Sequence, residues 1–278
     1  MDVTAAGSYF SLINPVQTVN QPLPLLGVPK PFPFEAVSAW ISRLAFSQCE
    51  TPGSIADFLG LAPRLDIDRA MYGNKLAAMR GRAGLQPEDF AIADQITGSL
   101  ASIAPIDDQY LIRARSNRAG FRFCIRCLES MRTPHFQIHW RFIAWRRCPL
   151  HECLLEDCCP HCKAPVLFPY DVETSTGGRI GYATLALCGS CGGKLTDEVP
   201  VSMPCHGVAA VKPREELMMS NGRALVAALF HGYLQMGRGR TEYGLGAIEE
   251  IHRRGDIPTE LEWMSPDKFR APVCDGRA

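Results

Sequence analysis

Eight side chains of the kinds that bind zinc occur in four pairs in the middle of this 278-residue chain. Each pair has a two-residue gap, which lets a tight turn direct both side chains at one metal ion. Pairing neighbours gives a Cys₃His site and then a Cys₄ site, each with four protein ligands and no open position for a catalytic water. The spacing predicts two structural Zn²⁺ ions, held by Cys124, Cys127, Cys148 and His151 and by Cys159, Cys162, Cys188 and Cys191.

The other cysteines admit different interpretations. A disulfide framework is typical of short secreted chains, whereas this longer chain has twelve cysteines and a start without the basic and apolar regions of a signal peptide. Cys49, Cys205 and Cys274 are expected to be small buried hydrophobes. Cys158 could compete with Cys159 as a ligand, but the two-residue spacing favours Cys159.

Composition limits the classes of function. The formal net charge is +0, so the whole chain does not attract nucleic acid through its overall charge. With 46% hydrophobic and 21% charged residues, the chain is expected to be globular. No apolar run approaches the roughly 18 residues of a membrane span. We therefore expect no membrane association and a cytoplasmic, nucleoid-associated protein.

Positive charge is concentrated in residues 110–150, which hold nine arginines against one acid, Glu129. The planar fork of arginine suits phosphates and base edges. A dense basic segment in a neutral chain is typical of a nucleic-acid contact. The alternative is that these arginines pair with acids elsewhere, such as Asp107, Asp108, Glu156 and Asp157. The predicted nucleic-acid-binding residues are Arg113, Arg115, Arg118, Arg122 and Arg126.

The helical periodicity is strongest before residue 100. Apolar residues predict an amphipathic helix over 34–46, and further helices are expected over 54–60, 66–80 and 87–99. Ser54 could cap the second of these helices, and Gly60 could end it. Two short helices joined by a brief turn resemble a helix-turn-helix, which can place its second helix in the major groove of DNA. The alternative is an ordinary helical hairpin, which any helical bundle contains.

The rest of the chain mixes turns and helices. A helix is expected to open at Thr133 and Pro134, a β-hairpin over 165–187, and helices over 222–236 and 241–254. The predicted fold is mainly α with small β. Its expected parts are a proline-rich arm at 1–30, a helical domain with a helix-turn-helix at 31–115, tandem zinc-ribbon-like modules at 116–200 and a C-terminal helical region at 201–278.

The order of these motifs resembles the TniQ/TnsD family. The similarity lies in RFCIRCL at 122–128, WR at 140–141, CPLH at 148–151, LL at 154–155 and CPHC at 159–162. The stretch PFEAVSAWISRLA at 33–45 is also similar to the family's opening motif.

That resemblance implies a non-catalytic accessory protein of DNA transposition. Family members act in target-site selection, bind DNA or an RNA-guided targeting complex, and recruit an AAA+ ATPase regulator. The implied fold is a helical domain with a helix-turn-helix, followed by tandem zinc modules held by the eight ligands named above. The short region after those modules favours an adaptor over autonomous targeting. A homodimer is left open.

Two other classes of protein remain as alternatives. One is a zinc-finger transcriptional regulator that has no transposition partner. The other is a nuclease or transposase, which would need clustered carboxylates that bind Mg²⁺. Asp66, Asp68, Asp107 and Asp108 form no recognisable acidic triad. We therefore expect the protein not to be an enzyme.

Overall fold

The computed structural model of the protein describes residues 25–62, 66–103, 110–112, 118–170, 184–203, 212–236 and 241–248, without the side chains of 212–221 and 235–236. The helices are α1 (Val37–Gln48), α2 (Pro52–Leu59), α3 (Ile67–Ala70), α4 (Gly73–Ala83), α5 (Ala91–Ile103), α6 (Ile125–Ser130), the 3₁₀ turn η1 (Ile138–Arg141) and α8 (Lys212–His231). The strands are β1 (Ala119–Phe121), β2 (Arg147–Cys148), β3 (Cys153–Leu154), β4 (Val166–Phe168), β5 (Tyr233–Met236) and β6 (Thr241–Gly244). The prediction of a mainly helical fold with small sheets is confirmed.

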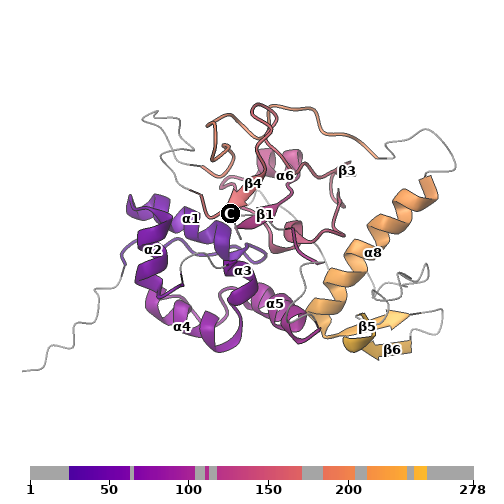
Figure 1. Cartoon of the computed structure of the whole chain (residues 1–278), viewed down its shortest axis with the longest axis horizontal. Coiled ribbons are helices and arrows are strands. Elements are labelled where there is room, and N and C mark those ends of the chain that lie inside the picture. The colour runs from indigo at the N-terminus through magenta and orange to yellow at the C-terminus, as the bar shows by residue number, and fades with distance from the viewer. Residues whose placement is uncertain are drawn as a thin grey trace, which may run out of the picture.

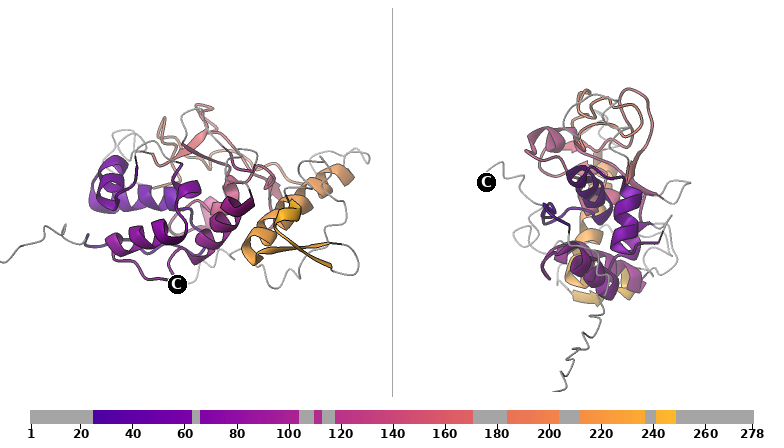
Figure 2. Two further views of the ribbon diagram at one scale, coloured as in Figure 1. Left: turned by 60° about the horizontal axis from the view of Figure 1, so that its bottom comes forward. Right: turned by 90° about the vertical axis from the view of Figure 1, so that its left-hand side faces the viewer.

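Helices α1 to α5 gather on one side of the molecule, and α8 with the β5–β6 hairpin lies on the other (Figure 1). The cysteine-rich segments, with β1, β4 and α6, lie between and above them (Figure 2). Helix α5 packs against α8, and α1 packs against β4. One continuous hydrophobic core runs from α1 through the cysteine-rich segments to α8. The domain boundaries at 115 and 200 stay a prediction.

Helix α1 lies at the centre of this core. The sequence predicts an amphipathic helix, but every residue from Val37 to Ala45 is buried. The apolar stripe is core, as expected, while the polar side chains Ser38, Ser42 and Arg43 are also enclosed. Buried polar groups need partners, so this helix must be bonded on several sides. It ends at Cys49, which is exposed rather than buried and has a left-handed backbone.

The two helices of the predicted helix-turn-helix differ from expectation in detail. Thr51, not Ser54, caps α2 by accepting a hydrogen bond from Ser54 N at 3.1 Å. The helix expected over 66–80 is wrong as one piece, because it breaks between α3 and α4. Asp94 from α5 accepts a 2.7 Å bond from Gly73 N, so a tertiary contact satisfies the start of a new helix there. DNA reading by this pair stays a prediction, and the helix expected over 87–99 is observed as α5.

The helix expected at Thr133 and Pro134 is wrong. Residues 131–137 are not helical, and the only helical turn between that point and Phe142 is η1. The backbone here pairs with the segment before α1: Ala36 N donates to Phe136 O at 2.9 Å, and Ile138 N donates to Phe34 O at 2.8 Å. This long-range pairing overrides the local capping signal. The aromatic side chains of Phe136 and Trp140 are buried.

The hairpin expected over 165–187 is wrong in its first strand, because β4 pairs antiparallel with β1. At the C-terminal end, the helix expected over 222–236 is observed as α8, which ends at His231 and is followed by β5. The start of the helix expected over 241–254 is instead strand β6, paired with β5. Residues 1–24, which cover most of the expected proline-rich arm, and Cys205 and Cys274 lie outside the described residues. Within the described residues, no helix is long and apolar enough to span a bilayer.

His135 makes the stability of this core depend on pH. Its ring stacks on Phe32 with centroids 4.1 Å apart, and burial lowers its pKa from 6.5 to about 4. The unfolded chain therefore takes up a proton at higher pH than the folded one, and the free energy of unfolding should fall from pH 6.5 to 4. One such group contributes up to about 1.4 kcal/mol per pH unit. Replacing His135 with Phe keeps a ring on Phe32 and should flatten the slope measured by urea unfolding. If the free energy of unfolding of His135→Phe depends on pH as steeply as that of the parent protein, His135 does not have this role. Loss of metal in acid would affect the parent protein and the variant alike, so it does not alter the comparison.

Candidate metal centre and its buried joint

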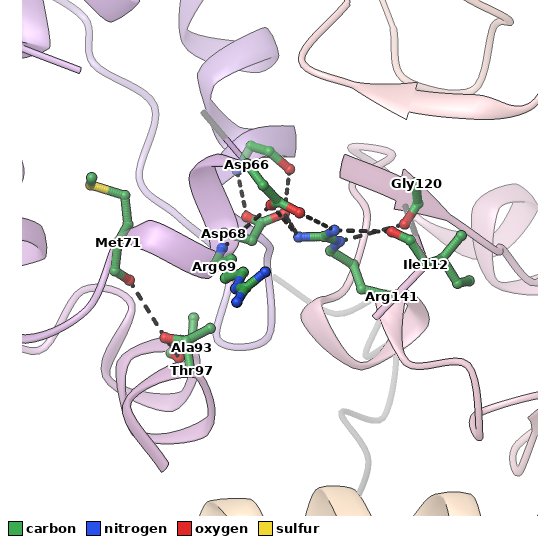
Figure 3. A network of polar contacts seen from close by, with 10 residues as sticks. Asp66, Asp68, Arg69, Met71, Ala93, Thr97, Ile112, Gly120 and Arg141 are labelled. Carbon is green, nitrogen blue, oxygen red and sulfur yellow. Dashed lines mark hydrogen bonds and ion pairs between the residues drawn. The ribbon is translucent and has the colours of Figure 1, made fainter. Parts of the chain in front are cut away.

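Arg141 connects the helical part of the chain to the cysteine-rich part by binding Asp66 and Asp68. We call these three residues the buried joint. The Arg141 side chain is fully buried, and Figure 3 shows it between Asp66 and Asp68 on one side and backbone carbonyls on the other. Nη1 lies 2.6 Å from Asp66 Oδ1 and 3.2 Å from Asp68 Oδ2, and Nη2 lies 2.7 Å from Asp66 Oδ2. Nη2 and Nε also donate to Ile112 O and Gly120 O at 3.1 and 3.4 Å. A guanidinium has five N–H donors, and all five are used.

The network continues into α1 through Asp68. Asp68 accepts a 2.8 Å bond from Ser38 N and a 2.6 Å bond from Ser38 Oγ. Burial raises the pKa of Asp68, while the charge of Arg141 opposes that rise. Burial alone would lower the pKa of Arg141, but Asp66 and Asp68 raise it, so the guanidinium stays charged. Three segments far apart in sequence are thereby fixed to one another.

A second buried pair holds the segment before α1. Arg43 binds Glu35 through Nε at 2.7 Å and Nη2 at 3.0 Å, and Nη2 also donates to Lys30 O at 2.9 Å. Burial raises the pKa of Glu35 to about 7 against the opposing charge of Arg43. Trp40 Nε1 donates to Pro29 O at 2.8 Å. The residues of the 33–45 motif are therefore structural in this chain.

The first Cys/His cluster is built by α6 and the β2–β3 hairpin. Cys124 caps α6 and accepts a hydrogen bond from Cys127 N, which lies within that helix. Cys148 ends β2, and His151 lies in the turn to β3. Ile125 occupies the first position of α6 and is buried. The turn that carries Cys124 and Cys127 is thus formed with isoleucine at the first helical position.

The distances in this cluster fit a tetrahedral metal site. His151 Nδ1 lies 3.4, 3.3 and 3.4 Å from the sulfurs of Cys124, Cys127 and Cys148, and the last two sulfurs are 3.6 Å apart. Ligands about 2.3 Å from a zinc ion at tetrahedral corners lie about 3.8 Å from one another. Hydrogen bonds from Cys124 and Cys127 lower the pKa of Cys148, which favours the thiolate form that binds metal ions. The donor set could hold a metal ion.

Cys153 is a residue that sequence reasoning missed. It is fully buried in β3, opposite Cys148 in the hairpin, and its sulfur lies 3.6 Å from that of Cys124. It therefore borders the first cluster without joining the four mutually close ligand atoms. Its position in the sequence carries no signal of this arrangement, because it lies outside the four pairs with two-residue spacing.

The second cluster is formed by two similar turns. The sulfurs of Cys159 and Cys191 are 3.7 Å apart, and those of Cys162 and Cys188 are 3.8 Å apart. All four lie within 4.8 Å of one another, so this cluster could also hold a metal ion. Cys159, and not Cys158, contributes to it. Leu187 pairs with Lys194 across the second turn, as in a zinc ribbon-like knuckle.

Tyr170 attaches the second cluster to the core. Its hydroxyl donates to Leu187 O at 2.9 Å, and its backbone N donates to Ser42 Oγ of α1 at 3.2 Å. A Cβ on Gly189 would come within 2.7 Å of the Tyr170 ring, so the turn needs glycine there. The two clusters differ in exposure: Cys124, Cys127 and Cys148 are buried, whereas Cys162 and Cys191 are exposed.

The predicted nucleic-acid-binding arginines have diverse environments. Arg118 donates to the carbonyls of Leu167 and Pro169, and Arg122 donates to Ile143 O at 2.8 Å. Burial lowers the pKa of both guanidinium groups. Arg126 is exposed on α6. Arg113 and Arg115 lie outside the described residues. Arg141 does pair with acids, but these are Asp66 and Asp68 rather than the acids expected from the sequence.

Loss of Arg141 should break the joint. Arg141→Met would leave two buried carboxylates without a cation, and breaking such a pair costs about 3–5 kcal/mol. Adding Asp66→Asn and Asp68→Asn should recover part of that loss, because the buried negative charges are removed. Urea unfolding measures the free energy of unfolding of the parent protein, of Arg141→Met and of the triple variant. The exposed Arg126→Ala should stay within about 0.5 kcal/mol, and an Arg141→Met cost no larger than this control would contradict the joint.

Because the two clusters differ in exposure, they should release their metal ions to a chelator at different rates. Elemental analysis is expected to return two zinc ions per chain. A chelator should remove one quickly, from the cluster with exposed Cys162 and Cys191, and the other slowly. Cys162→Ser should abolish the fast phase and leave a folded protein, whereas Cys148→Ser should cause aggregation. A single release phase, or one ion per chain, would show that the clusters are not independent sites of different access.

The N-terminal half of the chain is similar to a known protein family. Among curated proteins, none matches the chain. Residues 26–155 match the family model described as TniQ, a range that includes α1 to α6 and the first cluster but not the second. TniQ is a family of non-catalytic accessory domains associated with transposition complexes. The chain therefore carries a TniQ domain over residues 26–155.

Proposed function

We propose that this chain is a TniQ-type adaptor in DNA transposition. It would act in target-site selection by binding DNA or a targeting complex, including an RNA-guided one, and recruit an AAA+ regulator ATPase. The observation that carries the proposal is the TniQ match over 26–155. Each Cys/His cluster has four protein donors, which favours a scaffold over catalysis.

The metal we propose for both clusters is Zn²⁺. Its ligands would be Cys124, Cys127, Cys148 and His151 in the first site and Cys159, Cys162, Cys188 and Cys191 in the second. Sulfur and imidazole donors at tetrahedral spacing suit zinc. Binding would contribute to folding, on the order of 10–16 kcal/mol apparent per site in zinc-finger peptides. The metal would hold the shape on which partners dock.

DNA contact is proposed on two exposed basic surfaces. One is α6, where Arg126 projects beside the first cluster. The other is α4, the second helix of the expected helix-turn-helix, where Lys75 and Arg82 are exposed. Arg118 and Arg122 are engaged with backbone carbonyls, so they would position these surfaces more than bind phosphates. A homodimer would present each surface twice.

Arg126→Ala tests the α6 surface. If Arg126 neutralises one phosphate, its removal should make the slope of log K against log[salt] shallower by about 0.9. Fluorescence anisotropy with labelled duplex DNA measures that slope. Glu129→Gln on the same helix is the control, because it removes an exposed acid and should leave binding equal or tighter. An unchanged slope in Arg126→Ala would assign this surface to a protein partner.

Recruitment of the ATPase separates the leading proposal from its alternative. The adaptor should retain an AAA+ regulator on target DNA in a pull-down, and the ATPase should be lost when the adaptor is omitted. A sequence-specific footprint without any affinity for the ATPase would instead favour a zinc-finger transcriptional regulator. The regulator to use is one encoded beside this gene.

A further inference from the structure

A small pocket beside the first cluster is lined by three arginines from two distant segments. Its volume is about 180 Å³. One wall comes from the segment that leads into and follows β2, and the other comes from α8. The lining residues are Trp145, Arg146, Arg147, Pro149, Glu152 and Arg223.

Close backbone packing brings α8 to this place. A Cβ on Gly222 would lie 2.1 Å from Ala144 O, so only glycine allows the helix to approach the 144–145 backbone this closely. The next residue, Arg223, then lines the pocket. On the opposite wall, Trp145 is buried and fixes the chain on which Arg146 and Arg147 follow. The pocket is therefore produced by the fold and not by flexible surface side chains alone.

The lining carries excess positive charge. Among the lining residues that the structure describes, three arginines face one acid, Glu152, which gives these residues a formal charge of +2 (3 − 1). Glu152 Oε1 lies 3.0 Å from Arg147 Nη2, and this glutamate is largely exposed. Burial lowers the pKa of Arg223, and the nearby charge of Arg147 lowers it further. Arg146 is exposed, and its backbone carbonyl accepts a 2.9 Å hydrogen bond from Leu155 N, which fixes the chain at this point.

Like charges brought together in a half-enclosed site raise the energy of the protein until an anion binds. Guanidinium groups offer paired N–H donors that match the oxygens of a phosphate. The net charge of the whole chain is +0, so the attraction is local to this pocket.

We propose that the pocket formed by Arg146, Arg147 and Arg223 binds a phosphate group. Two sources share that chemistry: inorganic phosphate and the backbone of a nucleic acid. The second source would deepen the proposed function and rests on it. The first does not depend on it, so the two can be tested apart.

Trp145 supplies a reporter inside the pocket wall. Its indole Nε1 is buried and, within the described part of the chain, has no hydrogen-bond partner. Metal-loaded protein is labelled with ¹⁵N-tryptophan, and the Trp145 indole resonance is assigned by its absence in Trp145→Phe. Inorganic phosphate, titrated against chloride at equal ionic strength, should shift this resonance in a saturable way.

Single substitutions show whether the phosphate-induced shift of the Trp145 resonance arises from binding in this pocket. Arg223→Ala and Arg146→Ala should each weaken phosphate binding by about tenfold or more. Lys30→Ala, which removes one exposed positive charge outside the pocket, should bind as the parent protein does. Unchanged indole resonances of Trp40 and Trp140 show that a variant remains folded. A Trp145 resonance that phosphate does not shift, or that shifts equally in Arg223→Ala, overturns the proposal.

Titration with duplex DNA then shows whether the phosphate that binds in the pocket comes from a nucleic-acid backbone. A Trp145 shift with duplex that is lost in Arg223→Ala supports backbone phosphate as the ligand. Duplex binding by anisotropy without a Trp145 shift overturns the nucleic-acid source while DNA binding itself stands. Absence of any duplex binding counts against DNA contact in the proposed function, whereas the titration with inorganic phosphate still decides the pocket.

Discussion

The buried guanidinium of Arg141 is the constraint on which the arrangement of this protein depends. It is enclosed by the core and bonded to Asp66, Asp68 and two backbone carbonyls. Such a network costs desolvation, and its net contribution to stability is small. Its effect is on geometry, because each of the five donors has one partner and any shift of a segment leaves a buried charge unsatisfied. Helix α3, the η1 turn and strand β1 are thereby held in one relative position.

The Cys/His clusters connect further segments of the chain to those that the joint holds. The first cluster connects α6 to the β2–β3 hairpin, and the second is attached to α1 through Tyr170. The segments that carry the ligands contain little regular structure and short strands, so their own hydrogen bonds could not hold them. A metal ion bound in either cluster would act on the same continuous core as the joint, which suits a protein whose proposed role is to present surfaces in fixed positions.

The sequence predicts which Cys and His side chains come together in the two clusters, because the spacing within each pair is a local property. It also predicts the first helices, where apolar periodicity is strong. It does not predict the role of Arg141, which falls on an expected helix that does not form, because the pairing of 34–36 with 136–138 is long-range. From the sequence alone, Asp66 and Asp68 belong to a set of aspartates that forms no recognisable acidic triad, and no local pattern pairs them with Arg141. The β1–β4 pairing and the Cys153 position likewise depend on tertiary contacts that no local pattern encodes.

Hydrogen exchange on α1 during metal removal tests the central claim most directly, namely that metal sites and helices form one cooperative unit. The Ser38 amide, which donates to Asp68, is the most informative probe because it contacts no cluster ligand. Removal of both metals with a chelator is expected to abolish protection at Ser38 together with the rest of α1. If α1 amides keep their protection in the metal-free protein, the helical part folds independently and the account is wrong.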